Sequence, residues 1–289
     1  MSKQSLKLIE CPRDAMQGME NFISTELKVA YINKLLKCGF DTLDMGSFVS
    51  PRIIPQLSDT SEVLERIEGN TSTKLLTIVA NRIGAEAAVK FPQINYLGYP
   101  FSISETFQKR NINKGMEASM LLLEEIYELA AKSSKEVVLY LSMGFGNPYG
   151  DPWSEELVHE WMAKLESTFS ASIVAVSDTI GCAQPKQVEN LFSNLISEYP
   201  SIEFGAHLHV LPSNVSDLSK AAYSGGCRRF DSVIKGFGGC PMAKDELTGN
   251  MPTELLIKWM NENRLVHGVD SRAFEDALNF SDVVFASNS

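Results

Sequence analysis

Two histidines separated by a single residue are the most informative feature for chemistry in this sequence. His207 and His209 are half of the four histidines in the chain, and they lie in an apolar segment, residues 203–210, that has the pattern of a β-strand. Side chains two positions apart on a strand point the same way, so the two imidazoles should project side by side. That arrangement suits a divalent cation, although an isolated pair can also be two hydrogen-bonded strand histidines.

A third ligand for such a cation has to come from another strand. Asp14 follows the apolar segment 6–10 and is the best-placed carboxylate. One carboxylate and two imidazoles, completed by an oxygen or amide donor, suit Mg²⁺ or Mn²⁺ better than a structural zinc ion, which would recruit cysteines. The neighbouring Arg13 either forms a simple ion pair with Asp14 or presents its fixed charge to a developing oxyanion.

Further polar side chains occur at or near the ends of other apolar segments. Asp44 and Ser47 lie in segment 42–48, and Asp178 ends segment 173–178. Cys240 lies between two glycines and a proline, a loop setting in which a thiol can be exposed and reactive. Five cysteines without paired spacing argue against a disulfide framework. We expect the other four to be packing residues: Cys11, Cys38, Cys182 and Cys227.

Strand-like and helix-like segments alternate along the whole chain. The strand-like segments are residues 6–10, 42–48, 74–80, 94–101, 136–145, 173–178, 203–210 and 229–234. The helix-like segments are residues 25–38, 58–67, 85–90, 116–133, 154–169, 185–198, 213–223, 253–263 and 271–279.

Eight such units without a linker predict an α/β fold, a single-domain (β/α)₈ TIM barrel over residues 1–289. An open doubly wound sheet is the alternative. It would usually carry a glycine-rich phosphate turn after its first strand, where this chain has Cys-Pro-Arg-Asp at residues 11–14. A barrel gathers the ends of its strands at one mouth, so the polar residues above should converge there.

Composition narrows the classes of function. The 289 residues are 44% hydrophobic and 21% charged, as in an ordinary folded domain, and their net charge is −10. The acidic balance makes nucleic acid an unlikely partner, because binding to nucleic acid depends on Lys and Arg that neutralise phosphates. We expect no membrane span, since apolar stretches such as residues 137–145 are too short. Without a signal or transit pattern, we expect a cytoplasmic protein.

Several of these segments together resemble the 3-hydroxy-3-methylglutaryl-CoA lyase family of the DRE-TIM metallolyases. The resemblance covers about residues 10–279. The motifs that carry it are Arg-Asp-Ala-Met-Gln at 13–17, Gly-Ser-Phe-Val-Ser-Pro at 46–51, Lys-Arg-Asn-Ile-Asn at 109–113, Ser-Asp-Thr-Ile-Gly at 177–181, His-Leu-His at 207–209, and Gly-Gly-Cys-Pro-Met-Ala at 238–243.

The resemblance implies a (β/α)₈ barrel that uses a divalent cation to cleave 3-hydroxy-3-methylglutaryl-CoA into acetyl-CoA and acetoacetate. Asn250 would join the histidine pair and Asp14 as a metal ligand. Arg13 would face the thioester oxygen, and Cys240 would lie on a loop that closes over the substrate. Asp44 and Asp178 would be supporting carboxylates. The substrate-binding residues would be Arg13, Gln17, Ser47 and, toward the CoA moiety, Asn111. Barrel lyases are often homodimers, a state that the sequence leaves open.

Four positions depart from the family pattern. They are Ala15 for a glycine, Asp44 for a glutamate, Val210 and its successors for Asp-Thr, and Met242 for an aromatic residue. Changes around metal ligands can alter affinity and activity by about 10–100-fold. Three alternatives therefore stay open: a lyase acting on a related hydroxyacyl-CoA, a Claisen-type synthase or aldolase of the same superfamily, and a non-catalytic barrel that binds an acyl-CoA.

Overall fold

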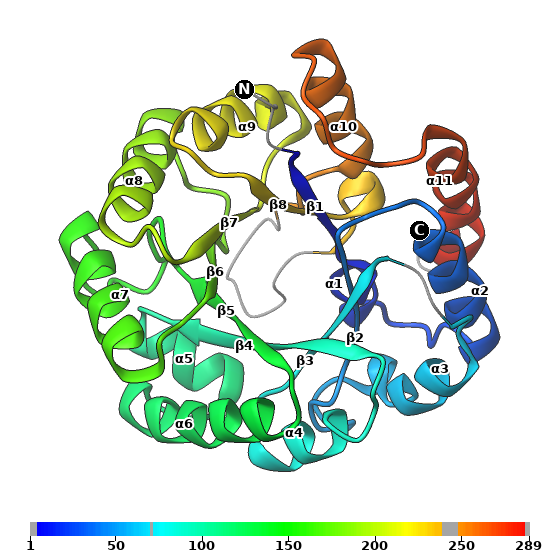
Figure 1. Cartoon of the computed structure of the whole chain (residues 1–289), viewed down its shortest axis with the longest axis horizontal. Coiled ribbons are helices and arrows are strands. Elements are labelled where there is room, and N and C mark those ends of the chain that lie inside the picture. Colours follow the sequence, from blue (N-terminus) through cyan, green and yellow to red (C-terminus); the bar gives the residue numbers. More distant parts are fainter. Residues whose placement is uncertain (1–4, 70–71, 239–247, 287–289) are drawn as a thin grey trace.

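The computed structural model describes residues 5–69, 72–238 and 248–286, which form a closed barrel of parallel strands (Figure 1). Each strand pairs with the next in sequence, and the last pairs with the first to close the ring. The strands are β1 (Lys7–Glu10), β2 (Thr42–Ser47), β3 (Lys74–Ile78), β4 (Ile94–Ser102), β5 (Glu136–Ser142), β6 (Ile173–Asp178), β7 (Glu203–Leu208) and β8 (Arg229–Ser232). The predicted TIM barrel is thereby confirmed.

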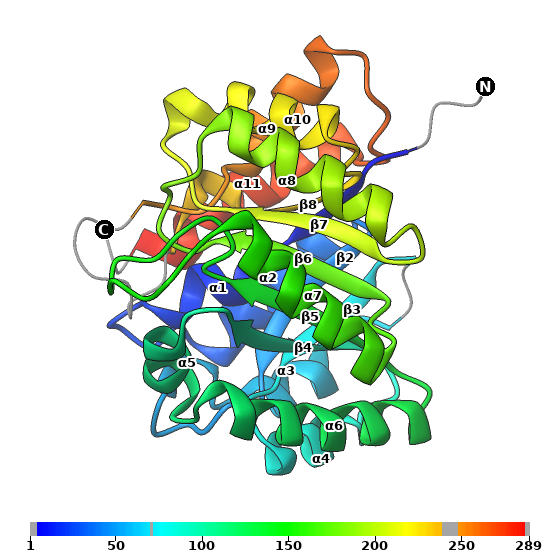
Figure 2. The same cartoon turned by 90° about the vertical axis from the view of Figure 1, so that its left-hand side faces the viewer.

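Helices form an outer ring around these strands, as the end-on and side views show (Figures 1 and 2). The α-helices are α1 (Pro12–Gln17), α2 (Thr25–Leu36), α3 (Thr60–Arg66), α4 (Arg82–Ala88), α5 (Glu105–Ile112), α6 (Met116–Lys132), α7 (Glu155–Phe169), α8 (Pro185–Glu198), α9 (Val215–Ser224), α10 (Thr253–Glu262) and α11 (Ser271–Phe285). The 3₁₀ turns are η1 (Pro55–Leu57), η2 (Pro212–Asn214) and η3 (Ile234–Gly236).

Local sequence signals explain where the longer helices begin. The hydroxyls of Ser24, Ser104 and Ser154 accept hydrogen bonds from the first turns of α2, α5 and α7. Asp270 does the same for α11. Such caps satisfy amide groups that have no partner within the helix, typically stabilising it by about 1 kcal/mol.

Two hydrophobic layers hold the barrel together. The larger one lies between the strands and the helices and includes buried residues such as Leu123, Val188 and Leu195. The smaller one fills the barrel interior on one side, with side chains that come from β3 to β6: Leu76, Ile78, Tyr96, Val138, Tyr140, Ile173 and Ala175. The neighbouring strands β7, β8 and β2 carry buried polar and charged residues instead, namely His207, Arg229, Asp231 and Asp44.

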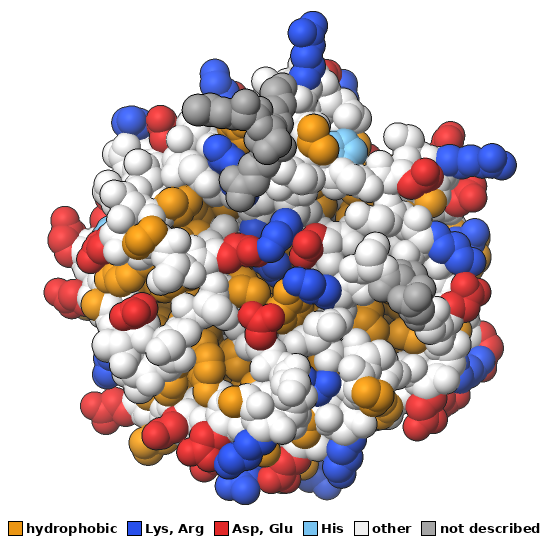
Figure 3. All heavy atoms as spheres, viewed as in Figure 1, with side chains coloured by type: hydrophobic (Ala, Val, Ile, Leu, Met, Phe, Trp, Pro, Cys, Tyr) orange, Lys and Arg blue, Asp and Glu red, His pale blue; other side chains and the backbone are white. Residues whose placement is uncertain are grey.

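Charged side chains also cover the end of the barrel at which the strands begin. On this face Lys7 forms an ion pair with Glu203, and Glu203 also accepts a hydrogen bond of 3.3 Å from Arg229. Figure 3 shows acidic and basic side chains gathered over the middle of the barrel on this face. The charges therefore compensate one another across the barrel floor. Within the described residues, no helix is long and apolar enough to span a membrane.

The sequence patterns missed two short helices and misplaced several element ends. The helices α1 and α5 follow β1 and β4 directly and are absent from the helices that the sequence predicts. β5 was expected to reach residue 145 but ends at Ser142, because Met143 adopts a left-handed backbone with φ of 60° and its amide donates to Thr179. That turn carries the chain away from the barrel wall.

Candidate functional site

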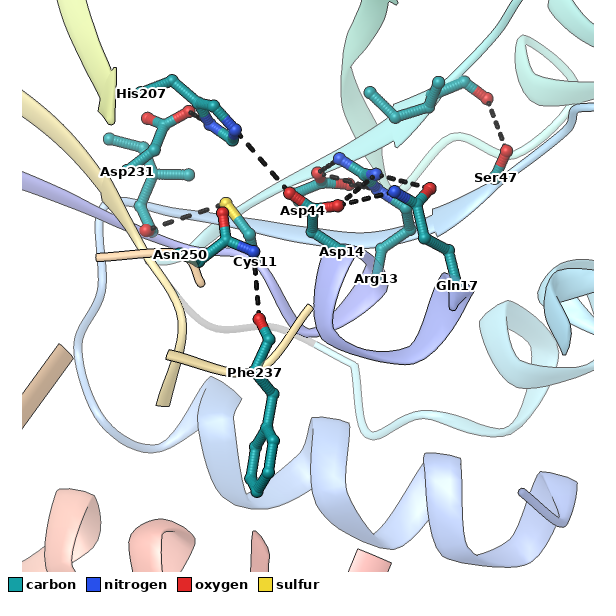
Figure 4. Close-up of polar contacts among 12 residues, drawn as sticks. Cys11, Arg13, Asp14, Gln17, Asp44, Ser47, His207, Asp231, Phe237 and Asn250 are labelled. Atoms are coloured by element: carbon teal, nitrogen blue, oxygen red, sulfur yellow. Dashed lines mark hydrogen bonds and ion pairs between the residues drawn. The ribbon is translucent and has the colours of Figure 1, made fainter. Parts of the chain in front are cut away.

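Three side chains that could bind a cation meet at the end of the barrel where the strands finish. Asp14 lies in α1 directly after β1, His207 lies in β7, and His209 immediately follows β7. One ligand atom from each lies within 4.8 Å of the others, and all three residues are buried. The distance from His207 Nε2 to Asp14 Oδ2 is 3.6 Å (Figure 4). The fold thus assembles the predicted carboxylate and imidazole pair from opposite ends of the sequence.

The His207 imidazole is fixed on the side that faces away from Asp14, and the pKa values of both imidazoles are shifted by their surroundings. Nδ1 of His207 is 3.1 Å from Oδ2 of Asp231, and the His209 ring hydrogen-bonds to the backbone at Thr248. Burial alone would lower the pKa of His207, but the hydrogen bond and charge of Asp231 outweigh burial and raise it. Burial and the neighbouring His207 lower the pKa of His209 to about 4, so the His209 imidazole is neutral at neutral pH.

Asn250 approaches the same point from the chain that follows β8. It forms an isolated antiparallel bridge with His209, and its side-chain amide donates to the carbonyl of Phe237 at 2.9 Å. The Asn250 amide also helps to lower the pKa of Asp14, after the larger effects of Arg13 and the two imidazoles. Gly238 makes this approach possible: its φ is 85°, and a Cβ there would lie 2.6 Å from the Asp14 carbonyl oxygen and 3.0 Å from the Asn250 amide nitrogen.

Arg13 is held beside Asp14 and the histidine pair by three partners. Its Nη1 is 3.2 Å from Asp14 Oδ1 and 3.0 Å from Gln17 Oε1, while its Nε and Nη2 bind the carboxylate of Asp44 (Figure 4). Burial would lower the pKa of Arg13, but the two carboxylates raise it, so the side chain stays a cation. Arg13 is thus both an ion-pair partner and a fixed positive charge at the mouth.

The two carboxylates beside Arg13 respond differently to burial. Burial raises the pKa of Asp44 to about 6 in spite of the adjacent guanidinium. At Asp14, burial also favours the neutral form, but Arg13 and the two imidazoles hold the pKa below its ordinary value. Asp14 therefore stays ionised to lower pH than Asp44, and its carboxylate can bind a cation.

A cavity of about 180 Å³ opens beside this group. Its polar wall includes Arg13, Asp14, Gln17, Asn111, Ser142, Ser177, Thr179, His207 and His209. Its apolar wall is formed by Val49, Ile53, Ile54, Ile78, Phe107 and Ile112. The cavity therefore has a polar side at the candidate cation-binding residues and an apolar side formed by the segment after β2, by β3 and by α5.

Three predicted site residues lie elsewhere or are not described. Asp178 turns its carboxylate toward the loop after β6, where it accepts hydrogen bonds from the amides of Cys182 and Ala183 at 3.0 and 2.8 Å. Ser47 accepts a hydrogen bond from Val49 and does not line the cavity. Cys240 lies outside the described residues.

Comparison with known proteins places this arrangement in a family. The family profile described as HMGL-like matches residues 7–281, which include every side chain discussed above. The chain belongs to the HMGL-like family. The family resemblance read from the sequence is thus confirmed, and the divalent-cation site that this family implies fits the buried donors Asp14, His207 and His209.

Relatives within the HMGL-like family match nearly the whole chain. Hydroxymethylglutaryl-CoA lyase YngG of Bacillus subtilis is 32% identical over 252 residues, which are 87% of this chain and 83% of that protein. A Pseudomonas aeruginosa protein named 3-hydroxy-3-isohexenylglutaryl-CoA/hydroxy-methylglutaryl-CoA lyase is 29% identical over 276 residues, covering 95% of this chain and 91% of its own length.

A solved structure extends the comparison to the fold. The structure of an HMG-CoA lyase from Acinetobacter baumannii in complex with coenzyme A and 3-methylmalate has a TM-score of 0.90 and 28% identity. The match covers 98% of this chain and 92% of that one.

Two buried charged residues were missed by the sequence interpretation, although both lie in the barrel near the candidate ligands. Asp231 contacts His207, and Arg229 lies two residues earlier on the same strand. Their signal was the alternation of charge in residues 229–232, where an interior strand normally carries apolar side chains.

Proposed function

We propose that this protein is a divalent-cation-dependent carbon–carbon lyase that cleaves 3-hydroxy-3-methylglutaryl-CoA to acetyl-CoA and acetoacetate. The observation that carries the proposal is the buried group of Asp14, His207 and His209, which lies beside Arg13 at the mouth of an HMGL-like barrel. The ligands we assign are these three side chains and Asn250. Their oxygen and imidazole donors favour Mg²⁺ or Mn²⁺.

The reaction is a retro-Claisen cleavage, and the chain supplies charge and position for it. A bound divalent cation would lower the pKa of the substrate's tertiary hydroxyl and orient its oxygens. Arg13 faces the thioester oxygen, where negative charge develops as acetyl-CoA departs as an enolate. Because Asp44 and Gln17 hold the guanidinium in place, little reorganisation is needed when that charge appears.

The remaining assignments concern the acyl-CoA and the proton balance. Asn111 lies on α5 at the edge of the cavity, where we place the CoA moiety. The apolar wall with Val49 and Ile78 excludes water from the enolate. We assign Asp178 the role of holding the loop after β6, and Ser47 that of supporting the turn after β2. Cys240 stays the predicted donor of a proton to the enolate carbon.

The direct test is a turnover assay with purified protein, Mg²⁺ or Mn²⁺, and 3-hydroxy-3-methylglutaryl-CoA. Acetoacetate is measured by coupled reduction with NADH. We expect cation-dependent acetoacetate release that is lost in His209→Ala, while the surface variant His159→Ala keeps it. No acetoacetate from the wild-type protein with either cation, in the presence of a thiol reductant, would refute the proposal.

A second candidate substrate is a glutaryl-CoA ester that carries a larger alkyl group at C3 in place of the methyl group. The apolar wall of the cavity reaches the protein surface at Ile53, whose exposed fraction is 58%, so a longer chain could leave the cavity along it. The Pseudomonas relative is named for both an isohexenyl and a methyl substrate. Comparing kcat/KM for 3-hydroxy-3-methylglutaryl-CoA and for esters with longer 3-alkyl groups decides between the two substrates. Incubating the protein with acetyl-CoA and a 2-oxo acid tests the synthase alternative.

The proposal also includes a cytoplasmic location and a homodimeric state. Cell fractionation tests the first. Sedimentation velocity of the full chain tests the second, with a single species of monomer mass as the contrary result.

A further inference from the structure

A line of buried charged side chains runs through the barrel interior beneath the candidate cation site. Arg229 and Asp231 are two residues apart on β8, so both side chains point inward. Their exposed fractions are only 1% and 3%. Asp231 contacts His207 above it, and Arg229 contacts Glu203 at the barrel floor. Charged side chains therefore extend from the barrel floor to His207.

The contact between Asp231 and His207 determines which ring nitrogen faces the cation site. A carboxylate can only accept a hydrogen bond, so Nδ1 of a neutral His207 carries the proton that is shared with Oδ2 of Asp231. The lone pair of such a ring is then on Nε2, which is the nitrogen that faces Asp14. This tautomer is the one that can bind a cation together with Asp14 and His209.

Arg229 is built into the barrel next to this pair. It pairs in register with Gly205 of β7, and a Cβ on Gly205 would lie 3.0 Å from Arg229 Cδ. Gly205 therefore leaves the space that the arginine stem occupies. A fully buried arginine costs several kcal/mol in solvation, and it is retained where a nearby negative charge compensates it.

The guanidinium has two sides with different surroundings. Its Nη1 is 3.3 Å from Glu203 Oε1 and 3.9 Å from Asp41 Oδ1. Its Nε and Nη2, like Oδ1 of Asp231 and the hydroxyl of Tyr140, have no hydrogen-bond partner among the described residues. Burial would lower the pKa of Arg229, but the carboxylate of Asp231 outweighs burial and raises it, so the two side chains interact inside the barrel.

We propose that Asp231 is a positioning residue that fixes His207 in the Nδ1–H tautomer, and that Arg229, two residues earlier on β8, is the buried positive charge that accompanies it. This rests on the proposed function in one respect, namely that His207 binds a cation. Cys11 also lies close to His207 and Asp231. It is a poor alternative ligand, because burial first and then Asp231 raise the pKa of its thiol well above the ordinary value.

Binding of Mn²⁺ to the metal-free protein, followed by the electron paramagnetic resonance of free Mn²⁺, tests the roles of both residues. We expect Asp231→Asn to weaken Mn²⁺ binding by about 10–100-fold, the range typical of groups that orient metal-binding histidines. Arg229→Met should weaken it by about tenfold. The matched control is Lys7→Met, which removes a charge from the barrel floor away from Asp231 and should change binding by less than about twofold. Asp231→Asn binding that equals wild type would overturn the proposal.

A second measurement needs neither a variant of Asp231 nor a bound cation. With only four histidines in the chain, the ring nitrogens can be resolved by ¹⁵N NMR at alkaline pH, and the His207 signals identified by their loss in His207→Asn. We expect the proton on Nδ1 of His207, and a proton on Nε2 would overturn the proposal. If wild type shows the Nδ1–H tautomer but binds no Mn²⁺, the proposed lyase function fails while the role of Asp231 stands.

Discussion

Glu10 provides a sharp test of how burial sets the stability of this barrel. It is the last residue of β1 and is completely buried. Oε1 accepts a hydrogen bond from the Ile234 amide at 2.8 Å, and Oε2 lies 2.6 Å from the hydroxyl of Thr253. Burial raises the pKa of Glu10 from 4.5 to about 8. Thr253 is also 3.0 Å from the Ser232 hydroxyl, so a protonated Glu10 can donate along this chain of hydroxyls.

The raised pKa predicts a stability that falls with increasing pH. The unfolded chain releases the Glu10 proton near pH 4.5, whereas the folded protein keeps it until about pH 8. Each pH unit in that window therefore costs about 1.4 kcal/mol of folding free energy, with an upper bound of about 5 kcal/mol over the whole window. Water penetration around an ionised carboxylate reduces this, and we expect a loss of about 2–3 kcal/mol.

Glu10→Gln removes this ionisation while keeping the shape of the side chain. We expect the free energy of unfolding of the variant, relative to wild type, to rise by about 2–3 kcal/mol between about pH 5 and pH 9, measured by urea denaturation. Glu62→Gln, the same change at an exposed glutamate of α3, is the control and should show no such rise. A difference between Glu10→Gln and wild type that stays constant within about 0.5 kcal/mol across this range would refute the reasoning.

Three further predictions concern the mouth of the barrel. Mn²⁺ affinity should fall about tenfold for each pH unit below the raised pKa of His207, because one proton competes with the cation for that imidazole. His209, with a pKa of about 4, stays neutral over this range. A slope of two protons in Mn²⁺ titrations between about pH 5 and 7 would contradict this prediction. Gly238→Ala should weaken Mn²⁺ binding at least tenfold, because the new Cβ would collide with the Asp14 carbonyl. The control Gly18→Ala, where the Cβ meets open space, should leave Mn²⁺ binding unchanged. Equal Mn²⁺ affinities of the two variants, measured by calorimetry, would contradict this role of Gly238. Arg13→Met should lower kcat by about 10²–10³-fold, because the charge that faces the thioester oxygen is lost. The variant should also lose about 3–5 kcal/mol of stability, because two buried carboxylates are left unpaired. A kcat within tenfold of wild type in the acetoacetate assay would count against the proposed role of the Arg13 charge in the reaction.

Much of the barrel could be predicted because its signals are local. Alternating apolar segments and their spacing indicate strands and crossover helices, and the two-residue period of a strand places His207 beside His209. The short helices α1 and α5 escaped prediction for the same reason. They have six and eight residues, too few to show a helical period, and α5 buries only Phe107 and Gln108.

The candidate site shows where local signals stop. Asp44 could be identified as a polar strand residue, but its contact with Arg13 depends on how α1, a short helix that the sequence pattern does not reveal, places the arginine beside β2. Asp178 also looks like a residue of the mouth, yet two loop amides bind its carboxylate. Which of several polar partners a side chain finds is decided by tertiary geometry.

Closure of the barrel gives the proposed cation a mechanical role as well as a chemical one. The ring is sealed where β1 pairs with β8, and the donors lie on both sides of that seam, with Asp14 after β1 and His207 and His209 on or just after β7. An ion bound by all three would act as a reversible cross-link that closes a loop of about two thirds of the polypeptide. Such a cross-link reduces the conformational entropy of the unfolded chain. Removing the cation with a chelator should then lower the melting temperature. Adding free cation back should raise the melting temperature again, at concentrations set by the affinity of the cation for the folded state.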